Sequence, residues 1–155
     1  MNIYLAGPFF NEEQIKYESL VAEALCANQA VESVFRPSQI KANHPFGTPE
    51  WKEEIFSLDT TMIKQSDAVV MIGNFIKQNH EIILDPGTAV ELGYAYANDI
   101  PVYLVIFNEE PAETVLNVMV DLASSYHIVG TEEEIYKQLQ YLDFSSGHRK
   151  DWKTT

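Results

Sequence analysis

Residues 68–107 read AVVMIGNFIKQNHEIILDPGTAVELGYAYANDIPVYLVIF, a segment in which two apolar runs enclose a helical pattern. The runs at 68–73 and 101–107 are continuously apolar, which is typical of strands covered on both faces of a sheet. Between them, Asp85 can cap a helix that begins at Pro86 and continues to about residue 98, while residues 74–84 are expected to form a loop. A strand, a helix and a further strand in this order predict a unit of parallel strands.

The same alternation continues on both sides of this unit. We expect further strands at 2–6, 33–36 and 126–129, and helices at 11–27, 49–65, 113–122 and 132–142, with a loop at 40–49. Asn11 and Thr48 are the expected caps of the first two helices. Five strands alternating with helices predict an α/β fold, a doubly wound five-stranded parallel sheet with flanking helices, in one domain over residues 1–143. Residues 144–155 are expected to be a loose polar tail.

Composition excludes several classes of protein. The 155 residues are 46% hydrophobic and 21% charged, so the chain can bury a core and is not intrinsically disordered. Its net charge of −13 disfavours binding to nucleic acid or to a membrane surface, since both carry negative charge. Only Arg36 and Arg149 could form a guanidinium clamp on a phosphate.

Targeting and metal-binding signals are weak. No basic region precedes the first apolar run, and no apolar stretch approaches the ~20 residues of a membrane span, so we expect a cytoplasmic protein. The four histidines are scattered and Cys26 is alone, which predicts neither a metal site nor a disulfide. Cys26 lies among helix-forming residues and is expected to be a small buried side chain. We expect no cofactor.

The most informative polar residue is Glu91, in the helix expected at 85–98. This helix is apolar around most of its circumference, which predicts burial and makes a carboxylate there unfavourable unless it is paired or used. Little side-chain bulk precedes Glu91 on its face, because Gly87 lies one turn earlier. Either Glu91 is a functional carboxylate, or it is a structural one satisfied by the hydroxyl of Tyr4 or Tyr94.

Other polar residues also have two interpretations. Asp85 is a helix cap, but it begins its helix at the carboxyl edge of the sheet, where ligands bind in such folds. Two carboxylates flanking one cleft suit glycosidic chemistry. Asp59 is either a site residue or part of a solvated helix face, and Asp67 is expected to be a turn residue away from the site. Asn117 interrupts an apolar run, where a capping or buried amide is the alternative to a functional role.

Three segments together resemble the nucleoside 2-deoxyribosyltransferase family over about residues 2–129: IYLAGPFF at 3–10, SLDTTMIKQSDAVV at 57–70 and DPGTAVELGYAYA at 85–97. The resemblance implies a flavodoxin-like fold and a transfer of 2-deoxyribose between nucleobases. It implies that Glu91 is the nucleophile, that Tyr4 holds its carboxylate, and that Asp85 and Asp59 line the site, with Asp85 contacting the sugar or helping to protonate the base.

The resemblance also implies a homo-oligomer, a dimer or a hexamer, with shared active sites. A neighbouring subunit would insert Asn117 and Met119 against the sugar. Gly7, Phe9 and Phe10 after the first strand, and Gly87, are the other expected substrate-binding residues, with the two aromatic rings stacking on the base. The expected partners are small deoxynucleosides and nucleobases, without nucleic acid, membrane, metal or cofactor.

Two alternative functions remain. A 2′-deoxynucleoside 5′-monophosphate N-glycosidase of the same superfamily would need phosphate donors after the first strand, where GPFFN offers neither serine nor arginine and Pro8 lacks an amide donor. A non-catalytic nucleoside-binding subunit is the second alternative, although the acidic positions are intact. A receiver domain is disfavoured because AGPFF carries no acidic pair.

Overall fold

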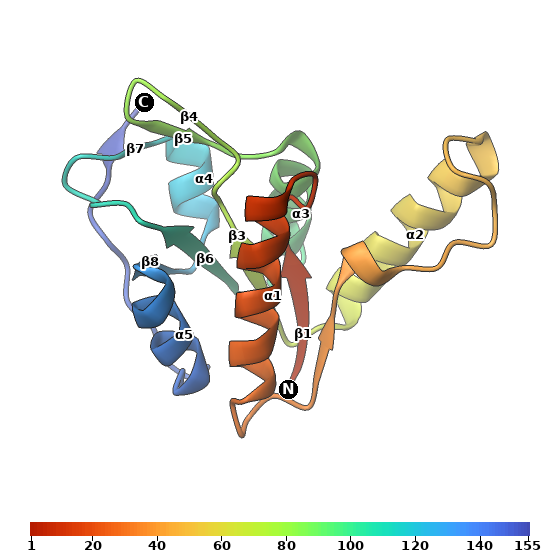
Figure 1. Cartoon of the computed structure of the whole chain (residues 1–155), viewed down its shortest axis with the longest axis horizontal. Helices are drawn as coiled ribbons and strands as arrows, with labels where there is room; N and C mark the ends of the chain where they lie inside the picture. Colours follow the sequence, from red (N-terminus) through yellow and green to blue (C-terminus); the bar gives the residue numbers. More distant parts are fainter.

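The computed structural model describes all 155 residues and contains two β-sheets (Figure 1). The larger sheet has five parallel strands in the order β2-β1-β3-β6-β8. Its strands are β1 (Asn2–Ala6), β2 (Ser33–Phe35), β3 (Ala68–Ile72), β6 (Val102–Phe107) and β8 (Tyr126–Gly130). The predicted α/β fold with a doubly wound parallel sheet is confirmed, and its strand order is that of the flavodoxin-like fold.

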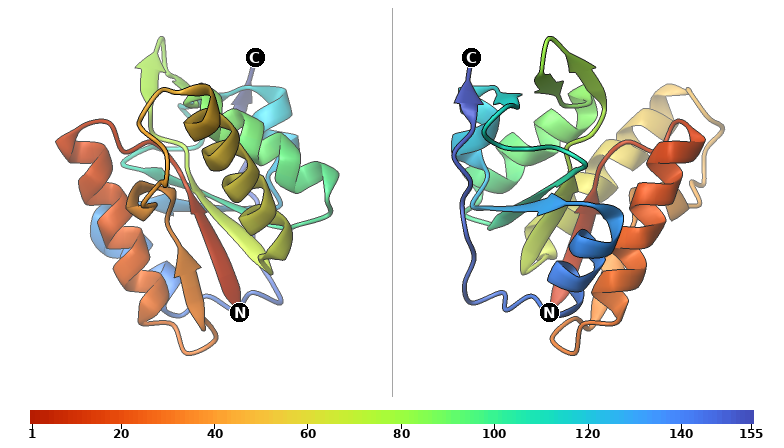
Figure 2. Two further views of the ribbon diagram at one scale, coloured as in Figure 1. Left: turned by 90° about the vertical axis from the view of Figure 1, so that its right-hand side faces the viewer. Right: turned by 60° about the vertical axis from the view of Figure 1, so that its left-hand side comes forward.

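Helices cover both faces of this sheet (Figure 2). α1 (Glu12–Cys26) and α5 (Glu132–Gln140) cover one face, and α2 (Pro49–Gln65) and α3 (Pro86–Ala97) cover the other. Every residue of β3 and β6 is buried between the two layers, as their continuous apolar runs predict. α2 is the most exposed of these helices, because only Ile63 is buried along its length, and its first half projects away from the sheet (Figure 1).

The helices begin where the capping residues predict. The side chain of Asn11 accepts a hydrogen bond from the Gln14 amide at 2.9 Å, and Thr48 accepts one from the Trp51 amide at 3.2 Å. Asp85 accepts one from the Thr88 amide at 3.0 Å. Each bond satisfies an amide of the first turn that has no partner within its helix, which explains why these three boundaries were predictable.

A second sheet contradicts three of the expectations. Its order is β4-β5-β7-β9, with β4 (Ile76–Gln78), β5 (Glu81–Ile83), β7 (Val115–Leu116) and β9 (Lys153–Thr154). The expected loop at 74–84 is therefore wrong, since it contains the β4–β5 hairpin. Asn79 and His80 form the hairpin turn with φ of 51° and 67°. Two central residues with positive φ make the tight turn that suits the twist of a hairpin.

The end of the chain is ordered, so the expectation of a loose tail is wrong. β9 pairs with β7, and Trp152 is only 9% exposed because its ring packs in the hydrophobic cluster on the α2 and α3 side of the large sheet. The helix expected at 113–122 is also wrong in its first part, where β7 lies. Asn117 then caps a shorter helix, α4 (Val118–Ala123).

Two expectations about burial are corrected as well. Cys26 is exposed, because it lies in the last turn of α1 on the side that faces away from the sheet. α3 is not buried all round: only Thr88, Leu92 and Ala95 are buried, while Val90 and Tyr96 are about two-thirds exposed at 60% and 63%. None of the five α-helices has both the length and the apolar character needed to cross a bilayer.

Candidate active site

A cavity of about 460 Å³ opens at the carboxyl edge of the large sheet. Its walls come from the loop after β1, from a 3-10 turn, η1 (Pro37–Gln39), and the loop that follows, from α2, and from the first turns of α3. It is lined by Gly7, Phe9, Phe10, Pro37, Ser38, Ile40, Ala42, Phe46, Trp51, Ile55, Asp59, Asp85, Gly87, Thr88 and Glu91. Three of these side chains are carboxylates and none is a lysine, arginine or histidine, so a cation is favoured inside and an anion is repelled.

Gly7 allows the chain to turn from β1 into this cavity. Its φ is +148°, and a Cβ atom at this position would lie 2.9 Å from the Cβ of Ile72, so a side chain would collide with β3. The turn brings Phe9 and Phe10 to the cavity with their rings stacked at 5.4 Å. The loop after β1 thus supplies a flat apolar wall, the kind of surface on which an aromatic base can stack.

Glu91 lies one turn and a half into α3, and Tyr4 holds its carboxylate. The Tyr4 hydroxyl donates a hydrogen bond to Glu91 Oε1 at 2.6 Å. Tyr4 is fully buried in β1, and its ring stacks on Phe35 of β2 at 5.5 Å, so the donor is held firmly. Both interpretations of Glu91 predict a tyrosine partner; the functional one gains support because Glu91 also reaches an open cavity beside two further carboxylates.

Asp85 and Asp59 approach the cavity from two different helices. Asp85 Oδ2 accepts hydrogen bonds from the amide and the hydroxyl of Thr88 at 3.0 and 3.3 Å, so Asp85 is both the cap of α3 and a lining residue. Asp59 lies on α2, and its Oδ1 is buried without a hydrogen-bond partner. A buried acceptor without a donor is unfavourable in a folded protein, and this one borders a space that a ligand can fill.

Burial raises the affinity of two of these carboxyl groups, Glu91 and Asp59, for protons. Burial is the main cause that raises the pKa of Glu91 to about 7, and the charges of Asp59 and Asp85 act in the same direction, against the Tyr4 hydrogen bond. Burial likewise raises the pKa of Asp59 to about 6. Burial and both neighbouring carboxylates raise the pKa of Tyr4 well above its usual range, so its hydroxyl remains a donor. Perturbed acids gathered in one cavity are typical of a functional site.

The raised pKa of Glu91 predicts a pH-dependent gain in stability for Glu91→Gln. The folded protein holds a proton on Glu91 up to about pH 7, whereas the unfolded chain loses it near the ordinary value of 4.5. Wild-type stability therefore falls as the pH rises through this window. We expect the variant to unfold with a free energy higher by about 1–3 kcal/mol at about pH 8, and with little gain near pH 5. Urea unfolding at both pH values measures this difference.

Glu133→Gln is the matched control for this prediction, because Glu133 is exposed on α5 and pairs only with Lys137. It is expected to leave the free energy of unfolding almost unchanged at both pH values. An equal effect of Glu91→Gln at both pH values would show that the buried carboxylate does not titrate as described.

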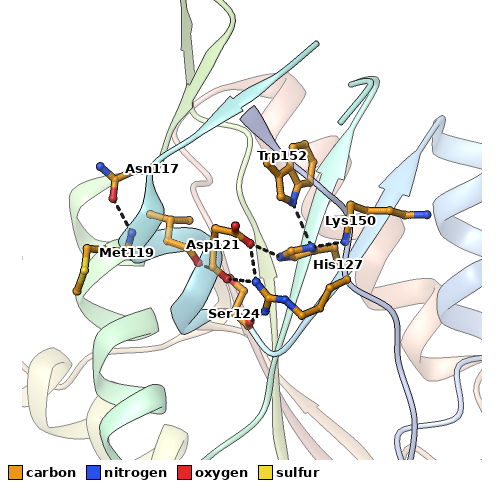
Figure 3. Close-up of polar contacts among 9 residues, drawn as sticks. Asn117, Met119, Asp121, Ser124, His127, Lys150 and Trp152 are labelled. Atoms are coloured by element: carbon orange, nitrogen blue, oxygen red, sulfur yellow. Dashed lines mark hydrogen bonds and ion pairs between the residues drawn. The ribbon is translucent and has the colours of Figure 1, made fainter. Parts of the chain in front are cut away.

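The structure brings most of the expected site residues together. Tyr4, Asp59, Asp85, Glu91, Gly7, Phe9, Phe10 and Gly87 all lie in or directly beneath the cavity. Asn117 and Met119 do not: they lie at the start of α4 (Figure 3). They line neither this cavity nor the one beside it, and Met119 is 74% exposed. The Asn117 side chain accepts a hydrogen bond from the Met119 amide, so its capping role is confirmed.

Sequence reasoning included Asp59 but missed the apolar side chains of the α2 wall of the cavity. Trp51, Ile55 and Asp59 are spaced four residues apart and so share one face of the helix, a signal that was present in the sequence. Phe46, 87% exposed, lies against Trp51 with ring centroids 4.6 Å apart. The same face of α2 borders a second cavity of about 350 Å³, between α2 and α3, which Asp59 and Glu91 also line.

No group of three or more histidine, cysteine, aspartate or glutamate side chains is arranged to hold a metal ion.

Comparison with protein families identifies the family of this chain. The model of the nucleoside 2-deoxyribosyltransferase family matches residues 3–137. The chain belongs to this family. The resemblance inferred from the three motifs is thereby confirmed, and membership of the nucleoside 2-deoxyribosyltransferases implies an enzyme that transfers glycosyl groups. A sequence comparison with curated proteins finds no match.

Solved structures agree with this family membership. A 2-deoxyribosyltransferase from the psychrotolerant bacterium Bacillus psychrosaccharolyticus is 31% identical, with 98% of this chain and 99% of that one aligned and a TM-score of 0.75. A conserved protein of Enterococcus faecalis V583 is 23% identical over 90% of this chain and 97% of its own, with a TM-score of 0.66. The CMP N-glycosidase BcmB of Clostridium botulinum is 19% identical over 90% and 98%, with a TM-score of 0.57. The last two share the fold.

Proposed function

We propose that this member of the family is a nucleoside 2-deoxyribosyltransferase that moves 2-deoxyribose from one nucleobase to another through a covalent ester on Glu91. The observation that carries the proposal is the Glu91 carboxylate, oriented by Tyr4 at 2.6 Å and open to a cavity that Asp59 and Asp85 also line. A carboxylate in this position can attack an anomeric carbon, and the remaining acids can handle a proton and sugar hydroxyls.

The reaction needs two displacements at the same carbon. In the first, a Glu91 oxygen bonds to C1′ as the bond between C1′ and the base nitrogen breaks, and the departing base takes up a proton. In the second, a nitrogen of the incoming base bonds to C1′, releases its proton and frees Glu91. Two inversions give overall retention, and the intermediate implies ping-pong kinetics. The cationic sugar in each transition state is stabilised by the negative charge of the cavity.

Asp59 is the side chain best suited to hold the proton that the leaving base requires. Its pKa of about 6 leaves a usable protonated fraction close to neutral pH, and its Oδ1 has no partner within the protein. Asp85 is tied to Thr88 by two hydrogen bonds, which suits a fixed contact with the sugar better than a proton transfer. This assignment extends the expected roles of the two residues from lining the site to separate functions.

The charge of the cavity favours a neutral nucleoside over a nucleoside monophosphate. No cationic side chain lines the cavity, and both arginines are engaged elsewhere. Arg36 binds Glu18 through two hydrogen bonds of 2.6 and 2.9 Å, and Arg149 binds Asp121. A phosphate dianion would meet three carboxylates without a counter-charge, which is why we favour the transferase over the monophosphate N-glycosidase.

A second copy of the chain is proposed to complete each site. Asn117 and Met119 are exposed and line neither cavity of their own chain, so the contact with the sugar expected of them would be made in the site of another copy. The second cavity opens beside Glu91 at a surface where Val90 and Phe56 are 60% and 64% exposed. Apolar surface of this kind is typical of an interface between subunits. A dimer or a hexamer satisfies this requirement.

Base exchange tests the proposal directly. We expect the protein to convert a 2′-deoxynucleoside and a different free base into the exchanged nucleoside and the released base, measured by chromatography. Reactions with one purine and one pyrimidine donor, each with and without acceptor, identify the bases used. The matching 5′-monophosphates serve as the contrast. Release of deoxyribose phosphate from the monophosphate alone, without exchange on the nucleosides, would contradict the proposal and favour the N-glycosidase.

A further inference from the structure

α4 is too short to be stable without contacts to the rest of the protein. It has six residues, none of them buried, and an isolated helix of this length does not form in water. It nevertheless begins at Asn117 and carries Met119, the two side chains proposed to enter the site of a neighbouring copy. Whatever fixes α4 therefore fixes the geometry of that other site.

Arg149 binds the carboxyl end of α4. Its guanidinium donates to the Asp121 carboxylate at 2.6 Å, to the Asp121 carbonyl at 2.9 Å, and to the carbonyl of Ser124, the capping residue at the end of the helix. The last carbonyls of a helix have no partner within it, and a cation there is also favoured by the helix dipole. The Arg149 side chain thus donates to two carbonyls at the end of α4 and also binds the Asp121 carboxylate in the middle of the helix.

The ring of His127 lies beside the same carboxylate but forms no hydrogen bond with it. It lies on β8 with its side chain fully buried, and its Nδ1 accepts hydrogen bonds from the Lys150 amide at 2.8 Å and from Trp152 Nε1 at 3.1 Å. Because Nδ1 accepts two donors, the ring proton is on Nε2, which faces Asp121 Oδ1 at 3.3 Å (Figure 3). Burial lowers the pKa of His127 to about 4, so the ring remains neutral at neutral pH.

The residues that follow Arg149 also hold the segment that precedes α4. β9 pairs with β7 in parallel, and the amide of Val118, the first residue of α4, donates to the Thr155 carbonyl at 3.4 Å. We call residues 149–155 the C-terminal clasp. It contacts α4 at both ends and through Asp121, while Asn117 and Met119 lie on the side of the helix away from His127 and Trp152 (Figure 3).

We propose that Arg149 is a positioning residue that acts in trans: through Asp121 and Ser124 it sets the place of Asn117 and Met119 in the active site of a neighbouring subunit. The proposal rests on the proposed transferase function with shared sites. A small displacement of a substrate-positioning group is enough to slow catalysis by about 100-fold, so loss of the clasp is expected to lower transfer without disturbing the subunit's own Glu91.

Mixed oligomers separate positioning in trans from a general structural effect. Chains carrying Glu91→Gln and chains carrying Asn117→Ala, co-expressed with two different tags and purified through both, regain transfer, because the intact Glu91 of one chain meets the intact α4 of the other. Arg149→Ala is then added to one chain at a time. Added to the Glu91→Gln chain, which supplies the working α4, it should lower kcat by about tenfold or more. Added to the Asn117→Ala chain, it should leave kcat within about twofold of the parent mixture.

An equal loss in both placements would overturn the proposal, because it would show a merely structural role. Failure of the parent mixture to regain transfer would overturn it too, since α4 would then serve no other subunit. Lys137→Ala, which removes an exposed cation of α5 in contact with Glu133, is the control and should change neither mixture. If Arg149→Ala prevents assembly, Arg149→Lys replaces it, since lysine keeps the charge but cannot bond Asp121 and Ser124 together.

Hydrogen exchange gives a readout that does not depend on activity. In Arg149→Ala, amides of Val118–Ala123 are expected to exchange at least about tenfold faster, with β1 and α3 unchanged. Unchanged exchange in α4 would overturn the clasp itself. Two results together would contradict the proposed function while leaving the clasp in place. The wild-type protein would show no transfer between bases, and the amide hydrogens of α4 would exchange faster in the variant.

Discussion

Replacement of Glu91 by glutamine is expected to reduce base exchange by about 10⁴-fold or more, because the amide cannot form the ester that divides the reaction into two steps. The substitution keeps the size of the side chain, and the Tyr4 hydroxyl can still donate to the amide oxygen. Binding of the nucleoside should therefore survive the loss of chemistry. Calorimetric titration of the variant with a deoxynucleoside measures whether this binding is retained.

Intact-mass measurement identifies the step that is lost. Wild-type protein incubated with donor and no acceptor should gain the mass of one deoxyribosyl group, and the Glu91→Gln variant should gain none. Glu133→Gln, on the exposed face of α5, is the control and should form the adduct normally. Near-normal transfer by the Glu91 variant would refute the assignment of the nucleophile.

Replacement of Tyr4 by phenylalanine should raise the pKa of Glu91 further. The Tyr4 hydroxyl stabilises the ionised carboxylate, and this bond opposes the burial that already raises the pKa to about 7. Hydrogen bonds to charged groups contribute about 1.5–3 kcal/mol, which corresponds to a shift of about one to two pH units. We expect the acidic limb of the pH profile of kcat/KM to move upward by this amount, with a loss of about 10- to 100-fold near pH 6 and a much smaller loss near pH 9.

Tyr103→Phe is the matched control, because Tyr103 is equally buried in the neighbouring part of the sheet. Its hydroxyl donates to the Phe144 carbonyl at 3.0 Å, on the α1 and α5 face. The control should lose some stability while its pH profile stays unchanged. If Tyr4→Phe lowers kcat/KM by the same factor at every pH, Tyr4 contributes only to packing.

The large sheet was predictable because each of its signals is local. Continuous apolar runs identify the central strands, and Asn11, Thr48 and Asp85 mark the starts of three helices with side-chain caps. The small sheet carried no such signal. Its hairpin turn uses Asn79 and His80 rather than the usual glycine, and its other strands are two residues long, so only tertiary contact defines them.

The site was predictable where a residue conflicts with its surroundings. Glu91 stands out because a carboxylate interrupts an apolar helix, and the family motifs add Tyr4, Asp59 and Asp85. The α2 wall carries no such conflict, since an apolar side chain on an amphipathic helix looks like a core residue. The clasp was invisible for a different reason: Arg149 follows every predicted element and acts through contacts about 25 residues away along the chain.

The small sheet also sets an order of events during synthesis. It joins segments near residues 80, 115 and 153, and β9 comes after all the other elements in the sequence. A growing chain can form the five-stranded sheet and the Tyr4–Glu91 hydrogen bond before β9 has been synthesised. It cannot yet form the contacts between the C-terminal clasp and α4. Under the proposed function, each polypeptide thus places the proposed nucleophile first, and it forms the contacts proposed to complete a neighbour's site only when β9 has been made.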